Sequence, residues 1–172
     1  MMRHSARRVP VAASWIEPLE TLLAPTAAFR GFALRLASHL DEERLFALHR
    51  EAMQDYVAAT WGWDETWQRE FFARTYVAGR HALIVRGESL AGRICLTRHW
   101  RRFFLRDIEL VAAERNRGLG SAIISALLEL ARDEHRAVDL IVLKCNPAQR
   151  LYARLGFTVI GDDGARLTMR AG

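Results

Sequence analysis

The sequence contains almost no lysine: Lys144 is the only one among 25 basic residues in a chain of 172. Arginine therefore carries nearly all of the positive charge, and the formal net charge is +5 at pH 7. Because arginine pairs well with phosphates and carboxylates, this excess is compatible with an anionic cofactor, with nucleic acid, or with a compositional bias. Acidic residues are interspersed almost everywhere along the chain, which favours the bias.

Cysteine is also scarce, with only Cys95 and Cys145. Two cysteines without the spacing of metal ligands argue against a disulfide framework and give no reason to expect a metal centre. Each stands in an apolar run, where a small buried thiol is the usual arrangement. We therefore expect both thiols to be buried.

No apolar stretch approaches the roughly 20 residues that a helix needs to cross a bilayer. Near the N-terminus, Arg3, Arg7 and Arg8 precede an apolar segment as in an export signal, but Glu17 and Pro18 interrupt that segment almost at once. The sequence therefore predicts a soluble protein with a cytoplasmic location and no membrane contact.

The length suits one folded domain, because a single core in a chain of 172 residues buries enough surface to offset chain entropy. Three of the four prolines lie within residues 1–30, which show no sustained periodicity. We interpret residues 1–30 as an N-terminal extension with one short helix around 15–23. The folded domain is expected over residues 31–172.

Hydrophobic periodicity predicts alternating strands and helices within that domain. Strands are predicted over 31–37, 81–86, 90–98, 103–111 and 138–143, with a closing hairpin over 157–170. Helices are predicted over 41–61, 64–77, 118–135 and 147–155. The three strands between 81 and 111 should form an antiparallel meander, and the whole order predicts an α/β (α+β) fold.

Residues 115–121, with the sequence RNRGLGS, stand between a predicted strand and the N-terminus of a strongly amphipathic helix. A helix N-terminus presents unpaired N–H groups and a partial positive charge, and glycine lets the backbone approach a phosphate closely. The loop can therefore hold a pyrophosphate, although two glycines can also serve only a tight turn and close packing. It lacks the Lys-Ser/Thr ending of a P-loop.

A second motif follows about 25 residues later: Asn146-Pro147-Ala148, then Leu151-Tyr152, then Leu155-Gly156-Phe157. The first motif resembles the coenzyme A pyrophosphate loop of the GNAT acetyltransferases, Arg-x-x-Gly-x-Gly, and the second resembles that family's downstream Asn…Ala…Leu-Tyr…Gly-Phe block. Two motifs in the right order are far harder to obtain by chance than either alone. The likeness covers 31–170 in element order and is sharp over 107–157.

This resemblance implies the GNAT fold, with a mixed, mostly antiparallel central sheet of six to seven strands flanked by about four helices. It implies an N-acetyltransferase that moves the acetyl group of acetyl-CoA to a primary amine of a small molecule or peptide, by direct attack in a ternary complex. A non-catalytic acyl-CoA binding or sensing module on the same fold is the alternative. The acceptor, the acyl chain length and the oligomeric state stay open, with a homodimer as one option.

The resemblance also assigns the cofactor contacts, most of them to the main chain. The amides of residues 115–121 would bind the pyrophosphate, Leu110 and Ala112 would bond the pantetheine arm, and Asn146 would hold the pantetheine or a water, or simply cap the next helix. The family often has proline at position 112 and glycine at 116, and neither difference removes an amide donor. The cofactor-binding candidates are Leu110, Ala112, Arg115, Asn116, Arg117, Gly118, Leu119, Gly120, Ser121 and Asn146.

Tyr152 corresponds to the family's usual general acid, which protonates the coenzyme A thiolate as it leaves. A phenol with a pKa near 10 suits that step, although a packing role is the alternative. Glu109 is the first candidate for the general base, because Glu109 and Asp107 share one face of the strand that runs into the loop. Asp107 or an ordered water could replace it, and either carboxylate could instead be paired with an arginine.

Two aromatic-rich segments suggest partners. The early helices carry Tyr56, Trp61, Trp63 and Trp67 with Asp64 and Glu65, which favours a cationic or aromatic amine as acceptor, although such a stretch is more often core. The block Arg98, Trp100, Arg101, Arg102, Phe103, Phe104 and Arg106 could bind nucleic acid by stacking and charge. Solvated arginines at a strand turn are the simpler explanation, so we do not expect nucleic acid as a partner.

Overall fold

The computed structural model describes residues 14–172, which form one seven-stranded sheet and five α-helices. The strands are β1 (Ala33–Leu36), β2 (His81–Arg86), β3 (Ser89–Arg98), β4 (Arg102–Leu110), β5 (Ala137–Leu143), β6 (Thr158–Asp162) and β7 (Arg166–Ala171). The helices are α1 (Ile16–Leu23), α2 (Glu42–Trp61), α3 (Glu65–Thr75), α4 (Leu119–Asp133) and α5 (Ala148–Arg154). Arg3, Arg7 and Arg8 lie outside the described residues.

The sheet has the order β1-β2-β3-β4-β5-β7-β6, and only the β4–β5 pair is parallel. This confirms the predicted mixed, mostly antiparallel sheet and its meander over β2, β3 and β4. The strand at 81–86 has the bounds that its apolar run predicts. A fifth helix accompanies the four predicted within the domain, because the short helix expected at 15–23 also forms.

The start of α2 differs from the expected cap. Asp41 occupies the N-cap position, but its carboxylate makes no cap bond to α2. It instead accepts from Arg35 and from the Ser38 N–H. These bonds, the one from Arg35 first, lower the pKa of Asp41 to about 2. Asp41 therefore fixes the turn between β1 and α2.

Asp64 does cap α3 as predicted, accepting from the Trp67 N–H at 2.9 Å.

The segment before residue 31 contributes to the main core. Trp15, Leu19 and Leu23 are fully buried, and they belong to the same apolar cluster as the inner face of α4. Phe29 joins them at 3% exposure. We therefore propose that the folded unit begins at about Trp15, ahead of the boundary at residue 31 that the prolines suggested.

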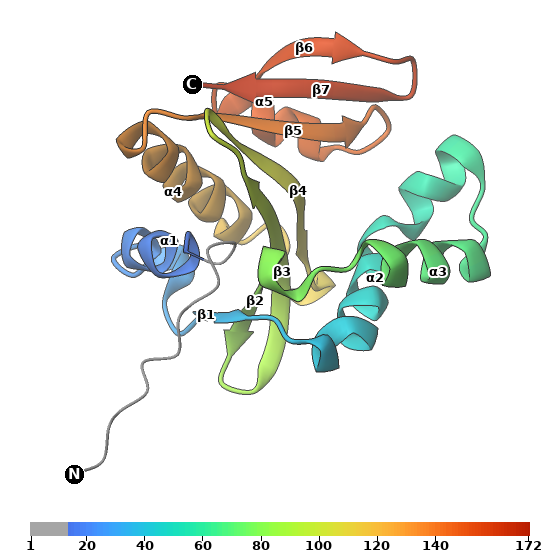
Figure 1. The fold of residues 1–172 in the computed structure, drawn as a ribbon, viewed down its shortest axis with the longest axis horizontal. Helices are drawn as coiled ribbons and strands as arrows, with labels where there is room; N and C mark the ends of the chain where they lie inside the picture. The colour runs from blue at the N-terminus through green and yellow to red at the C-terminus, as the bar shows by residue number, and fades with distance from the viewer. Residues whose placement is uncertain (1–13) are drawn as a thin grey trace.

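The helices cover the sheet on two sides (Figure 1). Helices α1 and α4 pack together on one face, where α4 contacts β4 and β5 and α1 contacts β1. Helices α2 and α3 lie on the other side of the molecule, where α2 contacts β4. The apolar stripe of α4, which includes Ile123, Ile124 and Leu127, is buried in the core. This arrangement leaves the N-terminus of α4 beside the end of β4.

The two central parallel strands diverge. Their pairing runs from Arg102 opposite Ala137 to Leu105 opposite Leu140 and then stops, although β4 continues to Leu110 and β5 to Leu143. Two strands that separate leave main-chain groups unpaired along their facing edges. An opening therefore forms between β4 and β5 at the end next to α4 and α5.

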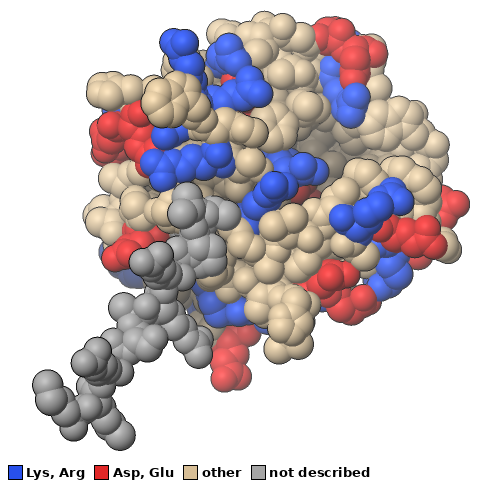
Figure 2. All heavy atoms as spheres, in the orientation of Figure 1, with Lys and Arg blue, Asp and Glu red and all other residues tan. Residues whose placement is uncertain are grey.

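Charged side chains are mixed on the surface, and only one of the two cysteines is buried as expected. Basic and acidic side chains are interspersed on the face drawn in Figure 2, with no single continuous basic patch. Cys95 is buried as expected, but Cys145 is exposed, with its Sγ 3.4 Å from the Thr60 Oγ1, because β5 ends two residues earlier. Among residues 14–172, no helix has the length and apolar character to cross a membrane.

Candidate functional site

A cleft of about 660 Å³ lies where β4 and β5 diverge. Its walls come from α2, the end of β4, the loop before α4, and α5. The sequence candidates that line it are Glu109, Leu110, Arg115, Asn116, Gly118, Gly120, Ser121, Asn146 and Tyr152. Residues taken from two motifs about 25 positions apart therefore meet in one cavity.

The loop of residues 115–121 turns sharply into α4. Asn116 and Gly118 have φ of 58° and 86°, in the left-handed region that asparagine and glycine tolerate best. Gly118 is the N-cap, and no side chain caps the helix. The N–H groups of Leu119, Gly120 and Ser121 thus lack intrahelical acceptors, and the positive end of α4 opens into the cleft.

The side chains of two loop residues point elsewhere. Leu119 is 1% exposed and packs in the core, so only its main chain is available to a ligand. Arg117 is largely exposed and lies 3.8 Å from Glu114. Both are consistent with recognition of a ligand by amides rather than by side chains.

At the end of β4, the main chain of Leu110 faces β5. The N–H of Val111 donates to a β3 carbonyl at 2.9 Å, and main-chain groups alternate along a strand. The Leu110 carbonyl accepts from Arg115 Nε at 2.8 Å, so its N–H is the group left facing the cleft. The N–H of Ala112 instead donates to Glu51 Oε1 at 2.9 Å. Of the two predicted pantetheine contacts, only that of Leu110 is directed into the opening.

Asn146 bonds the main chain at the start of α5, one residue before the N-cap Pro147. Its Oδ1 accepts from the Ala148 N–H at 2.9 Å at the start of α5, and its Nδ2 lies 3.9 Å from Met53 Sδ. It also lines the cleft, so capping and ligand contact are compatible.

Tyr152 is a packed residue that reaches the cleft. It is 8% exposed, and its ring centroid lies 5.8 Å from that of Phe157. No described residue bonds its hydroxyl. Burial first, then the charges of Asp107 and Glu109, raises the pKa of Tyr152 to about 12. The phenol therefore stays protonated at neutral pH, but it is a weaker acid than the ordinary phenol assumed from the sequence.

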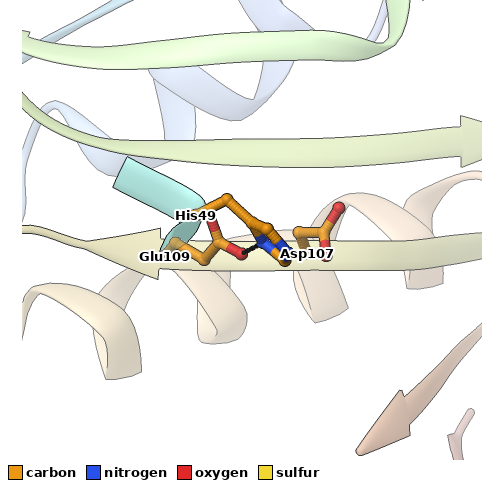
Figure 3. A group of neighbouring side chains, drawn as sticks. All are labelled: His49, Asp107 and Glu109. Carbon is orange, nitrogen blue, oxygen red and sulfur yellow. Dashed lines mark hydrogen bonds and ion pairs between the residues drawn. The ribbon is translucent and has the colours of Figure 1, made fainter. Parts of the chain in front are cut away.

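Glu109 is buried at 4% exposure among cationic and polar groups. Its carboxylate accepts from Arg93 Nε at 2.6 Å and Nη2 at 3.1 Å, and its Oε1 lies 2.7 Å from His49 Nδ1 (Figure 3). Burial alone would raise the pKa of Glu109, but Arg93 and His49 outweigh it and lower the pKa to about 2. So weak a base accepts protons poorly at neutral pH, which argues against Glu109 as the general base.

Arg93 extends the same network. It lies 3.3 Å from Asp107 Oδ2 and 3.2 Å from His81 Nδ1, and Cys95 Sγ lies 3.6 Å from His81 Nε2. Burial first, then the charge of Arg93, lowers the pKa of His81 to about 3, so this imidazole is neutral. Sequence reasoning missed Arg93, His81 and His49. Arg93 could have been found from the sequence, because it is an arginine inside an apolar strand. It pairs with Glu109 in the register of the hairpin.

The same residues raise the question of a metal. Ligand atoms of His49, Asp107 and Glu109 lie within 4.8 Å of one another. However, Arg93 already pairs with both carboxylates and is itself only 1% exposed. A divalent ion would have to share its ligands with a buried fixed cation, so the donor set suits the arginine better than a metal.

The aromatic cluster predicted for the acceptor is not gathered around the cleft. Only Tyr56 lines it. Trp61 and Trp67 are more than half exposed, and Trp63 donates to Glu65 at 3.0 Å. The sequence shows that these aromatic residues lie near one another along the chain, but it does not show which way each side chain points.

The arginine-rich turn between β3 and β4 is also dispersed. Trp100 is 88% exposed, but Phe103 is fully buried and cannot stack on a base. Arg98 pairs with Glu134 at 2.7 Å, and Arg102 lies 3.6 Å from Asp139. These contacts support the simpler interpretation of a strand turn with paired arginines.

Solved structures share the fold. The PaiA N-acetyltransferase of Thermoplasma acidophilum, in complex with coenzyme A, has a TM-score of 0.65 at 17% identity, covering 81% of this chain and 97% of that one. A GNAT acetyltransferase of Listeria monocytogenes has a TM-score of 0.60 at 16% identity, covering 81% of this chain and 94% of that one. Arabidopsis thaliana Naa50, in complex with the bisubstrate analogue CoA-Ac-MVNAL, has a TM-score of 0.56 at 14% identity, covering 83% of this chain and 99% of that one. At these identities the likeness shows the GNAT fold.

The sequence pattern of the acetyltransferase (GNAT) family matches residues 42–157, more than half of the chain. The chain therefore belongs to the GNAT acetyltransferase family, which confirms the resemblance seen in its two motifs. No curated protein matches the chain.

Proposed function

We propose that this chain is an acetyl-CoA-dependent N-acetyltransferase that acetylates a primary amine by direct attack in a ternary complex. The observation that carries the proposal is the uncapped N-terminus of α4, which opens into the same 660 Å³ cleft as Tyr152. Positive dipole ends attract phosphates, and a buried phenol beside them can supply a proton.

For the cofactor, the pyrophosphate would lie on the amides of residues 115–121 and the pantetheine arm between β4 and β5. The N–H of Leu110 faces that opening and would polarise the thioester carbonyl. Arg150 and Arg154 of α5 also line the cleft, which suits an anionic ligand. The complexes of PaiA with coenzyme A and of Naa50 with a coenzyme A analogue support this choice of donor.

For the leaving group, Tyr152 would give its proton to the departing thiolate. Its raised pKa, about 12, ensures that the proton is present when the thioester binds. The thiolate is a weaker base than this phenolate, so the transfer depends on the two groups being held close together.

For the acceptor, a cationic or aromatic amine would approach from the side of α2 and α3. Tyr56 lines the cleft on that side, and the side chain of Asp107, which lines the neighbouring small cavity against α3, is 30% exposed. An aromatic face and a partly solvated carboxylate favour a cation.

The test is thiol release from acetyl-CoA in the presence of a panel of primary amines, with mass analysis of the acylated products. We expect amine-dependent release that falls at least about 100-fold in Tyr152→Phe while acetyl-CoA affinity is retained. Binding without release would favour the sensing module, and absence of binding would contradict the proposal.

A further inference from the structure

Resting on the proposed function, we infer that His49 is the general base of the acetyl transfer and that Glu109 is a positioning residue that holds its imidazole. His49 lies on α2 and points towards Asp107 and Glu109 of β4 (Figure 3). Its Nδ1 lies 2.7 Å from Glu109 Oε1. The juxtaposition joins a helix and a strand that are 60 residues apart in sequence.

The hydrogen bonds assign the tautomer. Glu109 is ionised against Arg93, which donates to both of its oxygens, so the carboxylate can only accept. Nδ1 also lies 3.4 Å from Arg93 Nη2, which is a donor, but the contact of 2.7 Å with the carboxylate is much the shorter of the two and places a proton on Nδ1. When the ring is neutral, the lone pair is then on Nε2, and the carboxylate behind the ring holds the imidazole in this orientation.

The free nitrogen is accessible. The His49 side chain is 18% exposed, and no atom of residues 14–172 bonds to its Nε2. Among the described residues, Trp15 Nε1 is the one fully buried side-chain polar atom without a partner. Because His49 Nε2 also has no partner, it is not fully buried and is open to solvent. His49 and Asp107 both line a small cavity of about 80 Å³ against α3.

The position suits a base opposite the acid. Asp107 and Glu109, within 4.8 Å of His49, are also the two carboxylates whose charges act on Tyr152. His49 lines the small cavity and Tyr152 the larger cleft, and Glu109, which bonds His49 and also lines the cleft, connects the two. An amine that enters from the side of α2 would meet His49, and a thiolate in the cleft would meet Tyr152.

The proton balance closes with these two residues. The amine nitrogen attacks the thioester carbonyl carbon, and the new C–N bond creates an ammonium whose proton passes to His49 Nε2. The C–S bond then breaks, and the thiolate takes the phenolic proton of Tyr152. His49 releases its proton to solvent, and the tyrosinate regains one, which restores the starting state.

The surroundings of His49 are mixed in charge. The rings of Trp63 and Phe72 lie on its α3 side, with centroids 6.5 and 5.7 Å away. The titratable and charged groups that share its network or its cavity are Glu109, Asp107 and Arg106 of β4, Arg93 and Cys95 of β3, His81 of β2, and Arg80 and Tyr76 from the chain before β2. Several groups could therefore contribute to a pH profile. A change of activity with pH is assigned to His49 by substituting it, and not from the shape of the profile alone.

The kinetic test compares the pH dependence of kcat at saturating substrates in wild type, His49→Gln and the exposed control His39→Gln. We expect His49→Gln to lower kcat about 100-fold, to lose the decline of kcat on the acidic side, and to keep the affinity for acetyl-CoA. Any decline due to the amine itself would persist in the variant. Added imidazole should restore part of the rate in His49→Ala only, after subtraction of its uncatalysed reaction.

An acceptor-free measurement tests the same inference by nitrogen NMR of the histidines in the full chain. We expect the His49 signals to report Nδ1–H at pH 8 and to move towards the Nε2–H tautomer in Glu109→Gln. An Nε2–H tautomer in the wild type, or an unchanged kcat and pH profile in His49→Gln, would overturn the role of His49. Failure of the wild type to bind acetyl-CoA would instead overturn the proposed function, whatever the tautomer.

Discussion

The side of this molecule that we propose for the cofactor and the side that we propose for the acceptor are built in different ways; they are called the cofactor side and the acceptor side below. The cofactor side, residues 110–121 and 146–157, presents main-chain amides at one helix terminus and one strand end. The acceptor side, α2 and α3 with the strands β2 to β4 beneath them, presents a buried network of His49, Arg93 and Glu109. A short stretch of sequence encodes the first, whereas three separate elements must fold together to create the second.

The difference explains why only one side could be found by motif. Amide recognition needs residues that permit a backbone shape, and Asn116 and Gly118 have the positive φ that the loop requires. A side-chain network needs partners in register, and Arg93 meets Glu109 only because β3 and β4 pair. Substitutions on the two sides should therefore fail in different ways.

The largest effect is expected from Arg93→Met on the acceptor side. Arg93 is 1% exposed and neutralises Glu109 and Asp107, so its loss leaves two carboxylates near one another without a cation. We expect the free energy of unfolding in urea to fall by about 3–5 kcal/mol. Arg98→Met, at a partly exposed pair with Glu134, should cost less than about 1 kcal/mol, and equal losses would contradict the importance of the network.

On the cofactor side, Gly120→Ala should impair binding and leave the fold intact. A Cβ at Gly120 would meet Leu110 Cδ1 at 3.8 Å and Leu151 Cδ2 at 3.9 Å, which are ordinary contacts. Alanine also favours a helix by up to about 1 kcal/mol over glycine. We expect calorimetric affinity for acetyl-CoA to fall at least about tenfold with unchanged or higher stability. Unchanged affinity would mean that the cofactor does not approach this backbone.

The acceptor side should also make stability depend on pH through His81. Its pKa is lowered to about 3 in the folded chain against about 6.5 when unfolded, so below pH 6.5 the unfolded chain binds the additional proton. Stability is therefore lost as pH falls, by about 1 kcal/mol between pH 6.5 and 5.5. In His81→Gln this part of the slope should vanish in urea titrations at each pH. A slope identical to wild type would assign it to other groups.

The smallest effect is expected from Trp100→Ala, outside both sides. Trp100 is 88% exposed at the β3–β4 turn, so the free energy of unfolding should change by less than about 0.5 kcal/mol. Acetyl-CoA affinity should stay the same by calorimetry. A marked loss of either would show that this turn belongs to a functional surface.

The sequence alone predicted the elements well where local pattern determines them. The meander, α4 and the closing hairpin follow from periodicity, and the bounds of β2 agree to the residue. It did not predict that Trp15 and Leu19 join the core, because three prolines in residues 1–30 suggested an extension. Nor did it predict the use of Asp41, whose carboxylate pairs with Arg35 of β1 instead of capping α2.

For the site, pattern identified the loop at Gly118 and Gly120 and the tyrosine of α5, which the structure brings together. It proposed Glu109 from strand alternation, which gives the face of a residue but not its partners. His49 is one histidine among six, on an amphipathic helix, and only the fold reveals its contact with Glu109.

Amide hydrogen exchange with and without acetyl-CoA tests the central claim most directly, because it locates the cofactor without requiring an acceptor. The account predicts that acetyl-CoA slows exchange at residues 116–121 and at Leu110, while β2 and the N-terminal half of α2 are unchanged. Protection confined to the acceptor side, or no protection at saturating acetyl-CoA, would contradict the assignment of the cofactor to the N-terminus of α4.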